Sequence, residues 1–129
     1  MTDPRSLGPV HLQVPPEASL SRVLRLAAAG IASLAGFTID EIEDIKLAVS
    51  EVFLALLEHG SGQVVDIRFT VDDRSFAVRG QTVVGSFDAG HPDLIVSRTV
   101  LSEVSTNSGI ELVDDSARIW AEVAHATIE

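Results

Sequence analysis

The residues of this chain with the clearest chemical potential lie in one segment, where Glu51, Ala55 and His59 follow one another at steps of four. On a helix, residues four apart share one side. A carboxylate in such a place can orient an attacking hydroxyl or act as a general base. An imidazole can bind a metal or carry a proton, but a histidine in a last helical turn is also favourable simply through the helix dipole. The segment therefore predicts a candidate acid–base site with Glu51 at its centre.

The helix that carries Glu51 has two apolar faces. At 100° per residue, one stripe is typical of a side packed on a sheet: Ile42, Ile45, Val49, Val52, Phe53, Leu56. Nearly opposite, a second set surrounds Glu51: Leu47, Ala48, Leu54, Ala55. Two interpretations stay open. Either Glu51 is solvated while the leucines pack on a neighbouring loop or a dimer partner, or the loop over residues 82–91 folds across the patch and forms a pocket with Glu51 at its base.

The elements that position this helix can be read from local signals. Thr38 and Glu41 form a capping box that begins the helix, and Gly60 ends it after His59. Residues 10–14 alternate apolar and polar, which predicts a strand with one buried face. Residues 19–35 carry apolar residues at helical spacing, and Gly36 follows where a helix end favours a left-handed residue.

The second half of the chain reads as two hairpins separated by a loop and a helix. Residues 63–71 and 76–79 flank a polar turn, and residues 110–113 and 117–124 flank a second one. Between the hairpins, Pro92 suits the first turn of a helix that continues to residue 104. The predicted order is β-α-α-β-β-loop-α-β-β. We predict one α/β (α+β) domain over residues 1–129, a two-layer sandwich whose mixed, mostly antiparallel five-stranded sheet carries three helices on one face.

Composition limits the functions that remain. The chain has 129 residues, 46% of them hydrophobic, with no cysteine and a formal charge of −10. Its nine cationic residues are scattered singly along the sequence, so we expect no direct binding of nucleic acid. An acidic surface fits a basic protein partner, although it is also a common way to stay soluble.

Segments and spacings that would indicate a membrane or a metal are also lacking. The longest uncharged apolar stretch, residues 26–39, is shorter than the roughly 20 residues of a membrane span. The N-terminus carries no apolar core of signal-peptide length, so we expect no membrane binding and a cytoplasmic location. His11, His91 and His125 show no spacing typical of a metal site, and we predict none.

The segment around Glu51 resembles the anti-sigma factor serine kinase family, small regulators with the histidine-kinase-like (Bergerat) ATPase fold. That family carries E-x-x-x-N-x-x-x-H on its second helix, and here Glu51 and His59 match while Ala55 replaces the asparagine. The resemblance implies a Bergerat-type (GHKL) fold, with Glu51 as the catalytic carboxylate and Ala55 at the magnesium-ligating position. A methyl group cannot ligate a hard cation that requires oxygen.

Two further nucleotide-contacting motifs of the family are changed in this chain. In the family, D-x-G-x-G holds the adenine, whereas residues 78–82 read VRGQT, with Gly80 alone and Arg79 beside it. The glycine-rich phosphate lid is represented at most by Gly85 and Gly90. We therefore predict a degenerate ATP site in which Ala55, Arg79 and Gly80 are the altered positions. No cofactor is expected, and the alternative is ATP with Mg²⁺.

The resemblance leads to three hypotheses for function. The first is an anti-sigma-factor-like transcription regulator that binds a sigma factor or a STAS-domain antagonist without using ATP. The second is an ATP-dependent serine kinase that phosphorylates the STAS-domain antagonist. The third, the STAS antagonist itself, fits the order of elements poorly. Dimers are common in the family, so a homodimer is left open.

Overall fold

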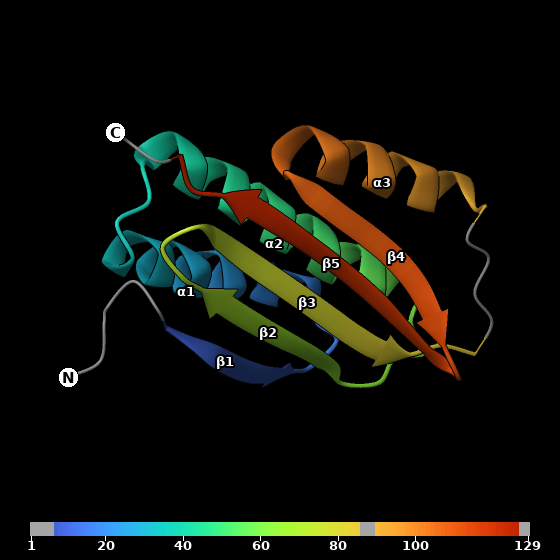
Figure 1. The fold of residues 1–129 in the computed structure, drawn as a ribbon. Helices are drawn as coiled ribbons and strands as arrows, with labels where there is room; N and C mark the ends of the chain where they lie inside the picture. The colour runs from blue at the N-terminus through green and yellow to red at the C-terminus, as the bar shows by residue number, and fades with distance from the viewer. Residues whose placement is uncertain (1–6, 86–89, 127–129) are drawn as a thin grey trace.

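The computed structural model describes residues 7–85 and 90–126, and Figure 1 shows them as a sheet with its helices on one face. The elements in chain order are β1 (Leu7–Val14), α1 (Ser21–Leu34), α2 (Ile39–His59), β2 (Val65–Val71), β3 (Ser75–Val83), α3 (Pro92–Val104), β4 (Asn107–Val113) and β5 (Ser116–Ala124). A short 3-10 turn, Ala18–Leu20, precedes α1. The predicted order of elements and the two-layer arrangement are confirmed. No helix in the described ranges has both the length and the apolar character needed to cross a bilayer.

The strands lie in the order β1-β2-β3-β5-β4, and all four pairings among the described residues are antiparallel. The sheet was expected to be mixed. The chain passes from β3 through the helix α3 to β4, and β4 runs in the same direction as β3, as in a parallel connection. However, β5 folds back and lies between them, so it pairs antiparallel with both.

The strand β3 is longer than the sequence indicated. It continues through Val83 instead of ending at Arg79, so Thr82 belongs to the sheet and not to the predicted loop. Thr82 is buried, and its hydroxyl donates to the carbonyl of Val64 at 3.0 Å. Of the rest of that predicted loop, residues 86–89 lie outside the described residues.

The helix α2 occupies the centre of the helix layer and buries the stripe predicted to face the sheet. Fully buried members of that stripe are Ile45, Val49, Val52, Phe53 and Leu56. Opposite them the sheet presents alternate residues, as the burial of every second position in β2 and β3 shows. Each such side chain contributes about 1.5–3 kcal/mol on burial, so this contact is a large part of the stabilisation by the core.

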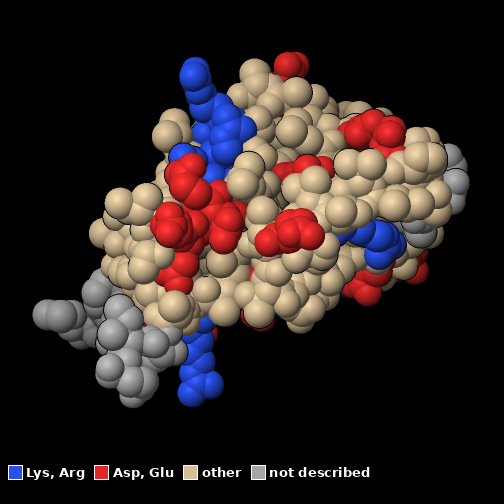
Figure 2. Space-filling view, turned by 90° about the horizontal axis from the view of Figure 1, so that it is seen from above, with Lys and Arg blue, Asp and Glu red and all other residues tan. Residues whose placement is uncertain are grey.

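Charge is distributed unevenly between the two sides of the molecule. Figure 2 shows acidic side chains gathered over the start of α2, where Asp40, Glu43 and Asp44 are exposed. On the sheet face away from the helices, Arg68 and Arg79 line one hollow together with other residues of β1 to β5. The expectation that the cationic residues are scattered singly is therefore wrong in three dimensions, because strand pairing brings together residues distant in sequence.

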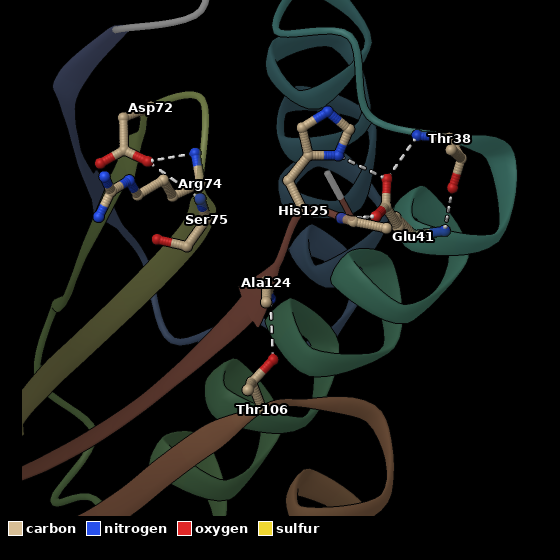
Figure 3. Close-up of polar contacts among 9 residues, drawn as sticks. Thr38, Glu41, Asp72, Arg74, Ser75, Thr106, Ala124 and His125 are labelled. Atoms are coloured by element: carbon tan, nitrogen blue, oxygen red, sulfur yellow. Dashed lines mark hydrogen bonds and ion pairs between the residues drawn. The ribbon is translucent and has the colours of Figure 1, made fainter. Parts of the chain in front are cut away.

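The carboxylate of Glu41 joins the start of α2 to the end of the described chain (Figure 3). The capping box is confirmed: Thr38 Oγ1 accepts from the backbone N–H of Glu41 at 3.2 Å, and Glu41 Oε1 accepts from the N–H of Thr38 at 2.7 Å. Glu41 also accepts from the N–H of Ala126 at 2.6 Å and pairs with His125 Nδ1 at 2.9 Å. His125 in turn stacks on Phe37, with ring centres 4.4 Å apart.

These contacts govern the titration of Glu41. Burial by itself acts to raise its pKa, but the hydrogen bonds from Ala126, Thr38 and His125 outweigh burial and lower the pKa from 4.5 to about 2. A carboxyl whose pKa is lower in the folded state stabilises the fold above its unfolded pKa. This contribution is complete above about pH 4.5 and is lost as the pH falls toward 2.

We predict that Glu41→Gln lowers the free energy of unfolding by about 1–3 kcal/mol at pH 7, and by less at pH 3, where the wild-type contribution is already reduced. Urea denaturation at both pH values measures the difference. Glu43→Gln is the matched control, because the one partner of the Glu43 side chain among the described residues is Lys46, in a surface pair, and its loss should change stability by less than about 0.5 kcal/mol. A Glu41→Gln deficit that is the same at both pH values would contradict the assignment.

Candidate functional site

The side chain of Glu51, on α2, contacts α3 and has a defined partner. The hydroxyl of Ser97 on α3 donates to Glu51 Oε2 at 2.8 Å. Ser97 is buried and Glu51 is half-buried, so the carboxylate is neither freely solvated nor enclosed. This contact comes from α3; residues 86–89 of the loop over residues 82–91 lie outside the described residues, so the expected cover of Glu51 by that loop stays a prediction. Sequence reasoning missed Ser97, whose only signal was its place on the face of α3 that also carries the buried Leu94 and Leu101.

The second apolar face of α2 is divided in the structure. Ala48 and Ala55 are buried, whereas Leu47 is 53% exposed and Leu54 is 39% exposed. Small residues allow close packing, and the two larger ones remain on the surface beside Glu51. The predicted patch is therefore half core and half open surface.

The three altered positions of the resemblance lie in two different places. Ala55 is on α2 and is 2% exposed, one turn beyond Glu51. Gly80 is on β3 and faces α2, whereas its neighbour Arg79 is exposed on the opposite face of the sheet. The fold thus brings Ala55 and Gly80 to the helix side and separates Arg79 from them.

Gly80 is a point of close approach between the sheet and α2. A Cβ atom added there would lie 2.5 Å from Leu56 Cδ1 and 2.9 Å from Val52 Cγ1. Both distances are shorter than packed carbon atoms allow. The space next to Gly80 is therefore filled by core side chains of α2.

The end of α2 and the beginning of α3 bring together a group that the sequence spacing did not indicate. Potential ligand atoms of His59, His91 and Asp93 all lie within 4.8 Å of one another. The two imidazole rings meet edge to face with centres 5.1 Å apart, and His91 Nδ1 accepts from the N–H of Asp93 at 3.2 Å. A hydrogen bond with Asp93, and its charge, raise the pKa of the adjacent Glu58. Two imidazoles and a carboxylate are a donor set that could hold a transition-metal cation.

Comparison with known proteins finds one matching family and several sequence relatives. The profile of the histidine kinase-like ATPase domain family matches residues 14–108. The serine-protein kinase RsbW of Bacillus subtilis is 39% identical over 71 residues, covering 50% of this chain and 44% of the relative. RsbW of Bacillus velezensis is 34% identical over 95 residues, covering 69% of this chain and 59% of the relative. The chain thus matches about half the length of these relatives.

Two solved structures share the fold at low sequence identity. The RsbU and RsbW domains of a Mycobacterium tuberculosis protein superpose with a TM-score of 0.72 at 12% identity, covering 92% of this chain and 33% of that one. The SiaB–SiaC complex from Pseudomonas aeruginosa gives a TM-score of 0.62 at 12% identity, covering 93% and 91%. At this identity the likeness concerns the fold, and the predicted Bergerat-type architecture is confirmed.

We predict that Gly80→Ala destabilises the protein by about 1–3 kcal/mol, because the added methyl group overpacks the contact with Leu56 and Val52. Gly30→Ala is the matched control. Gly30 lies exposed on α1, and a Cβ atom added there would have no neighbouring atom within 4 Å, so the change should stabilise by up to about 1 kcal/mol. Urea denaturation measures both variants, and a neutral Gly80→Ala would show that the core beside Gly80 is looser than these distances indicate.

Proposed function

Since the chain belongs to the histidine kinase-like ATPase family, we propose that it is an anti-sigma-factor-like transcription regulator that acts by binding a protein partner. The partner proposed is a sigma factor or a STAS-domain antagonist, and the ATP site is proposed to be degenerate. The observation that carries this proposal is the buried methyl group of Ala55, which stands one turn from Glu51 on α2. A homodimer stays a prediction that the oligomeric state in solution will test.

Three physical arguments support the loss of nucleotide binding. Mg²⁺ requires oxygen ligands, and Ala55 offers none. The space beside Gly80 is occupied by Leu56 and Val52 of the core. A triphosphate without its metal, placed in a chain of net charge −10, would leave several negative charges uncompensated.

The exposed surface of α2 supports the binding role. Leu47 and Leu54 are apolar and open to solvent, and Glu51 lies between them. The acidic side chains at the start of α2 border this patch on the same helix. An apolar centre with an acidic border suits a partner helix that carries apolar and basic residues.

The alternative, an ATP-dependent serine kinase acting on a STAS-domain protein, is favoured by one observation. Glu51, the candidate catalytic carboxylate, is held by Ser97 at 2.8 Å and is still partly accessible. A kinase would then need a magnesium ligand from a position other than Ala55. Nucleotide binding separates the two functions.

We predict that calorimetry with Mg-ATP at about 1 mM gives no binding heat, corresponding to a dissociation constant weaker than about 1 mM. The RsbW serine-protein kinase of Bacillus subtilis, measured under the same conditions, serves as the reference protein. A micromolar dissociation constant for this chain would reject the degenerate site and favour the kinase.

We also predict that the purified chain binds a sigma factor or a STAS-domain protein encoded in the same genome. Leu47→Glu and Leu54→Glu should each weaken that binding by about tenfold or more, since a charge would be buried in the contact. Leu112→Glu is the control, because Leu112 is equally exposed but lies on β4 of the sheet. Binding to none of these proteins, or equal loss in the control, would contradict the proposal.

A further inference from the structure

A row of directly paired residues crosses all five strands on the sheet face away from the helices. Register pairs His11 with Arg68, Arg68 with Arg79, Arg79 with Trp120, and Trp120 with Gly109. Directly paired residues of antiparallel strands present their side chains on the same face. The row therefore places an imidazole, two guanidinium groups and an indole side by side.

The two arginines of this row are an unfavourable pair in the isolated protein. Like charges directly opposite each other on neighbouring strands destabilise a sheet. Among residues 7–85 and 90–126, no hydrogen bond or ion pair engages the Arg68 side chain, and Arg79 only lies over the Trp120 ring at 6.0 Å. An anion between the two guanidinium groups would relieve this repulsion.

The indole at the end of the row has a fixed place. A Cβ atom at Gly109 would lie 2.6 Å from the indole nitrogen of Trp120, so only glycine lets the ring lie across β4. Trp120 is half-buried and leaves part of its ring accessible. The row thus ends in a flat aromatic surface next to a cationic one.

The neighbouring row supplies polar groups and completes a hollow of about 400 Å³. This second row includes Asp66, Gln81, Arg118 and Glu111, and Arg118 Nε donates to Gln81 at 3.0 Å. Three arginines and two carboxylates give the hollow a small positive charge in a chain of net charge −10. Its volume lies in the range of small-molecule sites.

We propose that this hollow binds a small organic phosphate with a planar ring, of the nucleoside monophosphate class. The phosphate lies between Arg68 and Arg79, whose planar forks match phosphate oxygens. The ring stacks beside Trp120, and Asp66 and Glu111 accept hydrogen bonds from hydroxyl or amino groups of the ligand. The site lies on the other side of the sheet from Glu51 and does not rest on the function proposed above.

The charge of the hollow also favours a ligand with one phosphate group over a ligand with three. The two carboxylates leave an excess of about one positive charge, which suits one phosphate group better than three. A monophosphate should therefore bind more tightly than the corresponding triphosphate.

Trp120 is the only tryptophan of the chain, so its fluorescence reports on this hollow alone. We expect AMP to change the emission of the full chain saturably. Adenosine, which lacks the phosphate, inorganic phosphate, which lacks the ring, and ATP should each need at least about tenfold higher concentration.

Arg68→Gln and Arg79→Gln should each raise the dissociation constant of AMP about tenfold or more, with the far-ultraviolet circular dichroism unchanged. Arg74→Gln is the matched control, because Arg74 is exposed in the turn between β2 and β3, outside the hollow. Calorimetry with Trp120→Phe checks that the ring contact, and not only the fluorescence signal, depends on residue 120.

Several results would overturn the proposal. No saturable change with AMP up to about 10 mM excludes the site. Equal affinity for inorganic phosphate and AMP would show that Trp120 does not contribute to binding. Equal affinity for adenosine and AMP would show that the arginines do not contribute. AMP binding that is unaffected in Arg68→Gln and Arg79→Gln would place the ligand elsewhere, including the family's own nucleotide site on the helix side.

Discussion

The close packing of α2 on the sheet is the constraint on which the rest of the structure depends. Gly80 on β3 has no side chain, and Val52 and Leu56 of α2 fill that space. With α2 fixed so close to the sheet, α1 packs along one of its sides and α3 along the other. The contact between Ser97 and Glu51, and the meeting of His59 with His91, follow from where α3 then lies.

The signals that predicted the fold act over a few residues, and those predictions hold. Thr38 and Glu41 determine the start of α2 through bonds to each other's backbone, and Pro92 stands at the first turn of α3. Whether neighbouring strands run parallel or antiparallel depends on partners far apart in sequence. No local pattern shows that β5 lies between β3 and β4, so the wholly antiparallel pairing could not be derived from the sequence.

The same distinction applies to the candidate sites. Glu51 stood out because helical periodicity alone surrounds it with apolar residues. Its partner Ser97 required the packing of α2 on α3. The row containing Arg68, Arg79 and Trp120 required both strand order and register, and neither follows from a local pattern.

The separation of charge between the two layers has a consequence at distances beyond contact. Acidic side chains gather over the start of α2, whereas the hollow on the opposite face of the sheet has a small positive charge from three arginines and two carboxylates, so the electrostatic potential differs between the two faces. Within about 10 Å, the screening length at ordinary salt, such a difference acts on an approaching charged molecule before it touches the surface. A basic protein and a small anion would therefore arrive on opposite sides and need not compete for the same face.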